Sequence, residues 1–318
     1  MTKAVQFICA LSKPRTVLAV ITGGDGFVGK HLADFLTKCG DEAVPTDISN
    51  GGPDLLDGNA LTEFFLSIKP EAVYHLAGQA DVGASWKNPK KTFQVNAEGT
   101  LNVLLACRNA NVHRVLTVSS AEVYGKVDQS KLPINETFPL LPSSPYAASK
   151  AAAEMISIQQ SSAEMEIMRA RSFNHFGPGQ SENFVASALA IRILRAQNSG
   201  EKTIPVGRLD TRRDFTDVRD VVRAYRSIIC DGISGEAYNV CSGKDRAVLE
   251  LAEALISAAE FEIDLCPDPD LQRPSDIPTL RGDNSKIKAQ TGWEPIIEFT
   301  QTVEDIIETT KSLIDVNR

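Results

Sequence analysis

The chain has 318 residues, of which 42% are hydrophobic and 23% charged, and its formal net charge is −8. This composition is typical of a soluble globular protein and argues against a disordered chain. No apolar run approaches the roughly 18 residues that span a bilayer. The acidic balance, without any run of lysine or arginine, argues against a nucleic-acid-binding face. The length allows one large domain or two unequal ones.

The cysteines are scattered, without a C-x-x-C pair or histidines at metal-ligand spacing. They are Cys9, Cys39, Cys107, Cys230, Cys241 and Cys266. We therefore expect reduced thiols, a cytoplasmic protein and no bound metal. The start of the chain lacks the small-residue cleavage site of a signal peptide, which argues against one. Residues 1–16 precede the first predicted strand, and we expect a disordered leader there.

From residue 17 onward, short apolar runs alternate with longer stretches at helical spacing. The pattern predicts strands at 17–23, 41–47, 71–78 and 114–120, and helices at 29–40, 60–70 and 93–110. Strands that are apolar on both faces, and are separated by helices of about a dozen residues, imply parallel pairing through right-handed crossovers. The predicted fold class is α/β, a doubly wound parallel sheet of the Rossmann type.

The regular alternation ends near residue 174, where segments rich in Gly, Pro, Asp and Arg begin. Loops of this composition on a rigid sheet usually carry ligand contacts. We expect a dinucleotide-binding domain over residues 1–173, with a returning segment near 215–243. A smaller, discontinuous α/β substrate domain is expected over 174–214 and 244–318.

The stretch "ITGGDGFVGKHL" places Gly23, Gly26 and Gly29 directly after the first predicted strand and at the start of a helix. Glycines there allow a tight turn and let backbone amides, here those near Phe27 and Val28, approach a pyrophosphate at the positive helix end. The motif is weak alone, and a purely structural turn is the alternative. Its strand–turn–helix context favours a nucleotide cofactor.

Asp47 ends the second predicted strand. A carboxylate there accepts hydrogen bonds from both hydroxyls of an adenine ribose and repels a 2′-phosphate, so NAD is favoured and NADP is possible. The alternative is an aspartate that caps a turn. Asp54, Leu55, Leu76 and Ala77 are further expected dinucleotide contacts. For Asp54 and Leu55, a turn carboxylate followed by a core leucine is the alternative.

The stretch "SPYAASKAAAEM" carries Tyr146 and Lys150 four residues apart, hence on one helix face. A phenol titrates near pH 10 in water, and a nearby ammonium is expected to lower that pKa. Ser120, at the end of a neighbouring strand, can share a substrate oxygen. These groups suit hydride exchange between a nicotinamide and an alcohol carbon, with Tyr146 handling the proton. A surface Tyr–Lys pair is the alternative.

With the glycine turn and "VSSAEVYG", these motifs resemble the extended short-chain dehydrogenase/reductase family of nucleotide-sugar epimerases, dehydratases and reductases. The resemblance covers nearly the whole chain from residue 17. It implies that Ser120 and Tyr146 surround the reacting oxygen and that Lys150 contacts the nicotinamide ribose. Asn96, in "VNAEGT", matches an asparagine that holds the active site together, with an ordinary polar residue near a helix start as the alternative.

The family resemblance also implies a homodimer formed through a four-helix bundle, which includes the helix with "AASKAAAEM". The alternative is that these alanines pack on the chain's own sheet.

The later motifs "RSFNHFGPGQSENFV", "RRDFTDVRDVVRAY" and "YNVCSG" resemble the GDP-mannose branch of that family, which implies a GDP-sugar substrate. Arg213 and Arg273 are expected to hold its diphosphate as guanidinium forks. Salt bridges with neighbours such as Asp214 or Asp217 are the alternative. The other expected substrate contacts are Ser85, Asn174, Asn183, Val185 and Asp276. His175 is either a ligand contact or a buried, hydrogen-bonded histidine.

Glu122 bears on the reaction that this family resemblance implies. In the 4,6-dehydratases of the family a matching glutamate removes a proton from sugar C5, whereas 4-epimerases usually lack it. Ala121 is apolar where dehydratases tend to place a polar residue. We therefore expect reduction of the C4 keto group of GDP-4-keto-6-deoxy-D-mannose to GDP-D-rhamnose, with Glu122 orienting the sugar. GDP-mannose 4,6-dehydration and UDP-sugar 4-epimerisation are the alternatives.

Overall fold

The structure is a computed structural model that describes residues 16–271 and 277–316. Of the expected leader over residues 1–16, residues 1–15 lie outside the described residues. So do Arg273 and Asp276, two of the expected substrate contacts.

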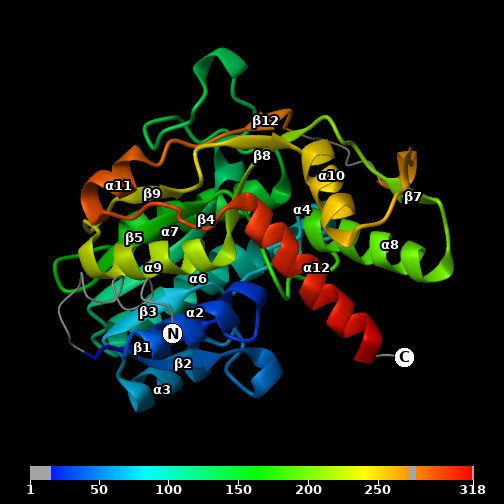
Figure 1. The fold of residues 1–318 in the computed structure, drawn as a ribbon. Coiled ribbons are helices and arrows are strands. Elements are labelled where there is room, and N and C mark those ends of the chain that lie inside the picture. The colour runs from blue at the N-terminus through cyan, green and yellow to red at the C-terminus, as the bar shows by residue number, and fades with distance from the viewer. Residues whose placement is uncertain (1–15, 272–276, 317–318) are drawn as a thin grey trace.

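The main sheet of the described part of the chain has six parallel strands in the order β2-β1-β3-β4-β5-β9 (Figure 1). The strands are β1 (Leu18–Thr22), β2 (Glu42–Thr46), β3 (Ala72–His75), β4 (Arg114–Ser120), β5 (Glu166–Ser172) and β9 (Ala237–Val240). The chain leaves β1 toward β2 on one side and later returns to β3 on the other. In such sheets, ligands bind outside the carboxyl ends of the strands at this switch point.

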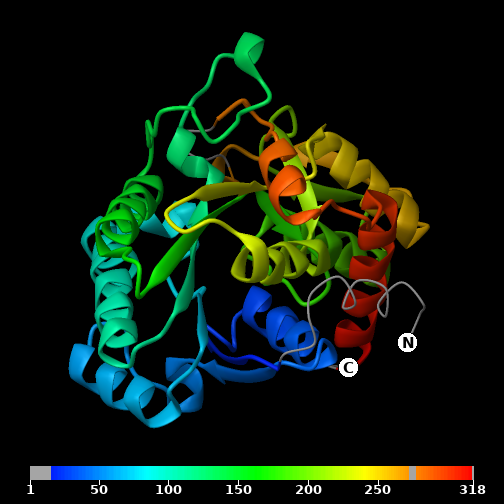
Figure 2. The ribbon, with the colours of Figure 1, turned by 90° about the vertical axis from the view of Figure 1, so that its left-hand side faces the viewer.

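Helices cover both faces of this sheet (Figure 2). One layer contains α2 (Phe27–Lys38) and α9 (Val218–Asp231), and the other contains α3 (Gly58–Ile68), α6 (Gly99–Asn109) and α7 (Pro145–Gln160). In β1, Ala19 and Ile21 pack against the α2 layer, whereas Val20 packs against α3 and α6. Both faces of the strand are therefore buried, which explains its uninterrupted apolar run. The predicted fold class, a doubly wound parallel sheet, is confirmed.

A second apolar core lies beyond the main sheet, where α12 is the red helix of Figure 1. It is enclosed by α8 (Val185–Ser199), α10 (Val248–Ala259), α12 (Phe299–Val316) and β7 (Thr203–Val206). Around β8 (Arg212–Asp217), β6 (Asn174–Phe176) and β12 (Thr279–Leu280) run parallel and β10 (Asp245–Ala247) antiparallel, while β11 (Asp264–Pro267) pairs with β7. Not all of the later chain joins this core. Ile287, in α11 (Ser285–Thr291), and Trp293 pack in the core of the main sheet.

The predicted helix over 93–110 is interrupted. After α4 (Val82–Lys87) and α5 (Pro89–Phe93), the chain forms a π-helical turn, η2 (Gln94–Glu98), before α6 begins. Asn96 lies within this wide turn and is buried. Its Oδ1 accepts from the Gln79 amide (2.8 Å), and its Nδ2 donates to the Gln79 carbonyl (3.0 Å) and to Ser149 Oγ (2.9 Å). Asn96 therefore ties the loop after β3 to α7.

Candidate active site

A cleft of about 690 Å³ opens at the carboxyl ends of the central strands, and its walls come from both parts of the chain. Of the residues selected from the sequence, it is lined by Gly23, Gly26, Phe27, Val28, Gly29, Asp47, Asp54, Leu55, Leu76, Ala77, Ser120, Glu122, Tyr146, Lys150, Asn174, Asn183 and Arg213. Ser85, Asn96 and Val185 do not line it. Ser85 is completely buried, and its hydroxyl donates to the Val82 carbonyl at 2.6 Å.

The glycine turn after β1 fits a dinucleotide diphosphate. Gly23 has φ +74°, and a Cβ there would lie 2.7 Å from the Ala77 amide nitrogen. A Cβ on Gly29 would lie 2.2 Å from the Gly23 carbonyl oxygen. Gly26 is the N-cap of α2 and supplies no side-chain cap, so the first-turn amides remain available to an anion at the positive end of the helix.

Ser120 and Tyr146 meet at the end of β4. Ser120 caps the short helix η3 (Ala121–Tyr124), since its Oγ accepts from the Glu122 amide at 3.2 Å. Tyr146 enters from the start of α7, where Ser144 caps the helix and Pro145 occupies its first position. The Tyr146 phenol is buried, and the Ser120 hydroxyl lies close enough to influence its pKa.

The expected lowering of the Tyr146 pKa is wrong for the protein alone. Burial raises the pKa of Tyr146 to about 12, and the negative charge of Glu122 adds to the rise. Lys150 is not among the groups that shift this pKa, and its ammonium donates to the Val118 carbonyl at 2.9 Å. Burial lowers the pKa of Lys150 to about 8, partly opposed by Glu154. At neutral pH the cleft therefore presents a protonated phenol beside a mostly charged ammonium.

A buried polar network braces the segment that carries Ser120 and Glu122. The Glu154 carboxylate accepts from Ser119 Oγ (2.5 Å) and from Arg171 Nε and Nη2 (3.0 and 2.8 Å). Arg171 also donates to the Tyr124 hydroxyl (3.0 Å), which itself donates onward to Asn239 (2.7 Å). Both flanks of the segment are thus fixed to α7, β5 and β9.

The loop after β5 forms the opposite wall of the cleft. His175 lines this wall, and its Nδ1 lies 3.2 Å from the Phe173 carbonyl oxygen. Because a carbonyl only accepts, Nδ1 carries the proton and Nε2 is left as an acceptor. The ring stacks on Phe27, the first residue of α2, with centroids 6.2 Å apart and planes at 17°. His31 Nε2 lies 3.0 Å from the Pro178 carbonyl. Two contacts therefore join α2 to this wall of the cleft.

Arg213 is buried in the same wall, and its Nη1 donates to the carbonyls of Arg212 (2.9 Å) and Ile277 (2.7 Å). Asp214 and Asp217 were the alternative salt-bridge partners expected for Arg213. The carboxylate of Asp214 accepts backbone amides such as that of Ser242 (2.7 Å). The carboxylate of Asp217 instead pairs with Arg219.

Several cleft residues were not singled out from the sequence. They are Thr22, Thr46, Gln79, Lys91, Gln180, Ser181, Ser172 and Tyr225, among others. Tyr225 comes from α9, and its hydroxyl lies 2.7 Å from Ser172 Oγ. No local motif marks these positions, because they reach the cleft only through the tertiary fold.

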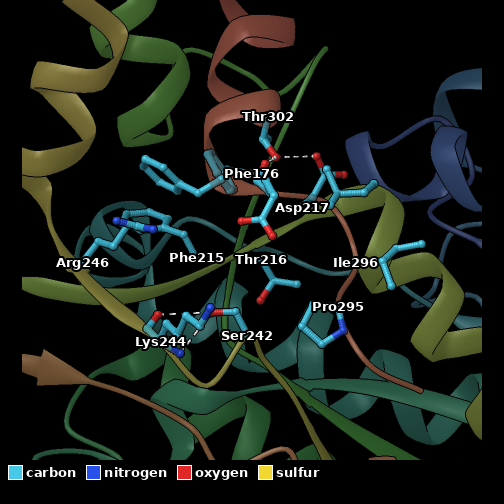
Figure 3. A pocket seen from close by; sticks show the side chains of 13 residues that line it. Phe176, Phe215, Thr216, Asp217, Ser242, Lys244, Arg246, Pro295, Ile296 and Thr302 are labelled. Carbon is cyan, nitrogen blue, oxygen red and sulfur yellow. Dashed lines mark hydrogen bonds between the residues drawn. The ribbon is translucent and has the colours of Figure 1, made fainter. Parts of the chain in front are cut away.

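A second, smaller hollow of about 80 Å³ lies between β8, the turn before β10 and the start of α12 (Figure 3). There Thr302 donates to Asp217 at 2.7 Å, and Arg246 lies 4.3 Å from the ring centroid of Phe299. The Thr216 hydroxyl is buried without a partner among the described residues. None of its lining residues lines the cleft, and the glycine turn does not reach it. The cleft is therefore the candidate active site.

The fold and the cleft together define a dinucleotide-dependent oxidoreductase with a Rossmann-type sheet. The family model described as GDP-mannose 4,6 dehydratase matches residues 46–306, and the chain belongs to this family. A GDP-6-deoxy-D-mannose reductase from Pseudomonas aeruginosa is 37% identical over 297 residues, which cover 92% of this chain and 97% of the relative.

Solved structures agree with this assignment. The structure of RMD from Pseudomonas aeruginosa complexed with NADPH matches with a TM-score of 0.85 at 35% identity, covering 93% of this chain and 99% of that one. The UDP-glucose 4-epimerase of Thermus thermophilus in complex with NAD matches with a TM-score of 0.82 at 28% identity, covering 92% and 98%. The predicted extended short-chain dehydrogenase/reductase family and NAD(P)-dependent enzyme class are confirmed.

Within the described ranges, no group of three or more His, Cys, Asp or Glu side chains is arranged to hold a metal ion. A search of the same residues finds no helix that is both long and apolar enough to cross a membrane.

Proposed function

We propose that the protein reduces the C4 keto group of GDP-4-keto-6-deoxy-D-mannose to give GDP-D-rhamnose. The observation that carries this proposal is the protonated phenol of Tyr146, which lines the dinucleotide cleft together with Ser120. A carbonyl reduction needs a proton donor at the developing alkoxide, and a phenol that is protonated at neutral pH can supply that proton. The similarity to a GDP-6-deoxy-D-mannose reductase supports the same direction of reaction.

In this mechanism the reduced nicotinamide, when bound, supplies the hydride to C4. Tyr146 donates its phenolic proton to the sugar O4. The Ser120 oxygen already accepts from the Glu122 amide, so its own proton is available to hydrogen-bond the same oxygen. Lys150 holds positive charge beside the phenolate that forms, with its Nζ anchored on the Val118 carbonyl.

We assign Glu122 a positioning role. Its carboxylate lines the cleft beside Ser120, and Ala121, its neighbour in η3, is buried and apolar. A 4,6-dehydratase in which Glu122 abstracts the C5 proton is the second candidate, favoured by the family model and by that carboxylate. A 4-epimerase is the weaker alternative.

For the ligands, we propose that Gly23, Gly26, Gly29 and Asp47 hold the dinucleotide. Asn174, Asn183 and Arg213 are proposed to bind the sugar nucleotide, because they line the wall opposite the glycine turn. The core of the main sheet would then serve the cofactor, and the core around α8, α10 and α12 the substrate. His175, with its free Nε2 acceptor, is added as a contact for a ligand hydroxyl.

We also propose a homodimer through the helices of the α6–α7 layer. Trp86, Phe93, Leu105, Met155 and Ile158 are exposed large apolar side chains on α4 to α7, with exposed fractions between 41% and 51%. Such a surface suits burial against a second copy. The five cysteines that the structure describes form no disulfide with one another, which suits the cytoplasm expected from the sequence.

The test is to mix purified protein with GDP-4-keto-6-deoxy-D-mannose and NADH or NADPH, then follow reduced-nicotinamide absorbance and identify the sugar formed. Stoichiometric oxidation with a GDP-6-deoxyhexose as product supports the reductase. Conversion of GDP-mannose to its 4-keto-6-deoxy form without added reductant would instead establish the dehydratase.

A further inference from the structure

Two carboxylates meet one hydroxyl beside the dinucleotide cleft. Asp47 lies at the end of β2 and lines the cleft, whereas Asp25 belongs to the glycine turn after β1. The Oγ of Ser49 lies 2.8 Å from Asp25 Oδ2 and 2.9 Å from Asp47 Oδ1. A hydroxyl carries one proton and donates to one of them at a time. The other carboxylate oxygen is therefore open to a donor from a ligand.

Backbone hydrogen bonds hold this arrangement in place. The Gly24 amide donates to the Thr46 carbonyl at 3.0 Å, and a Cβ on Gly24 would lie 2.5 Å from Pro45 Cβ, so the glycine turn packs directly on β2. After β2, Asp47 caps η1 (Ile48–Asn50): its Oδ1 accepts from the Ser49 amide at 3.1 Å. These hydrogen bonds hold both carboxylates within reach of the Ser49 hydroxyl.

Neither negative charge is neutralised nearby. Within the described residues, no ion pair joins Asp25 or Asp47 to a lysine or arginine. The segment from 41 to 57 contains neither residue type. A 2′-phosphate of about −1.5 to −2 charge would meet two carboxylates and no counter-charge from this turn. A ribose 2′-hydroxyl, by contrast, has a proton to donate to the free carboxylate oxygen.

We propose that Asp25 is a second specificity-determining carboxylate, which acts with Asp47 through Ser49 to select NADH over NADPH. The inference deepens the proposed function and rests on it for the identity of the cleft as the cofactor site. The matching structure from Pseudomonas aeruginosa holds NADPH. This chain is therefore expected to depart from that relative in the cofactor it takes.

The test compares the dissociation constants of NADH and NADPH by fluorescence titration, without any sugar nucleotide. Wild-type protein should bind NADH on the order of 50-fold more tightly than NADPH. Asp25→Asn should strengthen NADPH binding and reduce that ratio about five- to tenfold, with little change for NADH. Asp34→Asn is the matched control, since it removes the same charge from an exposed position on α2 that pairs with Lys38. It should leave the ratio unchanged.

Two results overturn the proposal. One is NADPH binding as tight as NADH binding in the wild type, and the other is a ratio that Asp25→Asn leaves unaltered. If that variant does not fold, the salt dependence of the wild type decides. Salt screens the repulsion between the carboxylates and the 2′-phosphate, so the ratio of the NADPH to the NADH dissociation constant must fall as ionic strength rises. Because no turnover is measured, selective NADH binding without reductase activity would refute the proposed function and leave this inference standing.

Discussion

Replacing Lys150 by methionine tests the charge balance of the active site. The Lys150 ammonium is buried, and its pKa of about 8 replaces an ordinary value of 10.5. At 1.36 kcal/mol per pKa unit, carrying the charge destabilises the folded protein by roughly 3 kcal/mol at neutral pH. Methionine keeps the apolar stem but loses the hydrogen bond to Val118, worth about 1 kcal/mol. Lys150→Met should therefore be more stable by about 2 kcal/mol, and inactive.

Thermal melts across pH measure this effect, with a rise in Tm of roughly 2–5 °C expected at pH 7. Between pH 8 and 10.5 the unfolded wild type binds more protons than the folded form, so wild-type stability rises with pH in that window. The difference in stability between Lys150→Met and wild type must therefore shrink between pH 8 and 10.5. A variant that is less stable than wild type at pH 7, or an advantage that is constant with pH, would refute the reasoning.

Three other substitutions probe the site and the network behind it. Tyr146→Phe should lower kcat at least 100-fold and leave the dissociation constant of NADH unchanged, since only the proton donor is lost; an unchanged kcat would remove Tyr146 from the proton path. Glu122→Gln should lower kcat less than about 100-fold, because a positioning group is not the base; complete inactivity together with dehydratase activity in the wild type would contradict this. Glu154→Ala should lower the free energy of unfolding, measured in urea, by about 3–5 kcal/mol, because Arg171 is left buried and uncompensated; Glu154→Asp, which keeps the charge, should lose less.

Local patterns predicted what local geometry controls. The glycine turn, Tyr146 and Lys150 were found because each depends on spacing within one strand–turn–helix unit or one helix. The parallel sheet followed from the alternation of apolar runs and helices. The interruption at η2 could not be foreseen, because the apolar spacing of 93–110 is compatible with one continuous helix.

Other features depended on the tertiary fold. The predicted direction of the Tyr146 pKa change was wrong because the sequence shows the spacing of Tyr146 and Lys150 along the helix, but not the burial of the phenol or the negative charge of Glu122 close to it. Asp25 was not singled out for a similar reason: only the contact between the glycine turn and β2 brings it to Ser49.

The π-helical turn has a consequence for how the chain tolerates changes in length. A wide turn accommodates one residue more than a regular one, and each residue of an α-helix advances the face by about 100°. Deleting one residue from Gln94–Glu98 would let a continuous α-helix form, yet would rotate Asn96 and everything before it relative to α6. The loop after β3 would lose its anchor with no side chain removed from the cleft. Deleting one residue at this point should therefore disturb the active site more than most substitutions of cleft residues would.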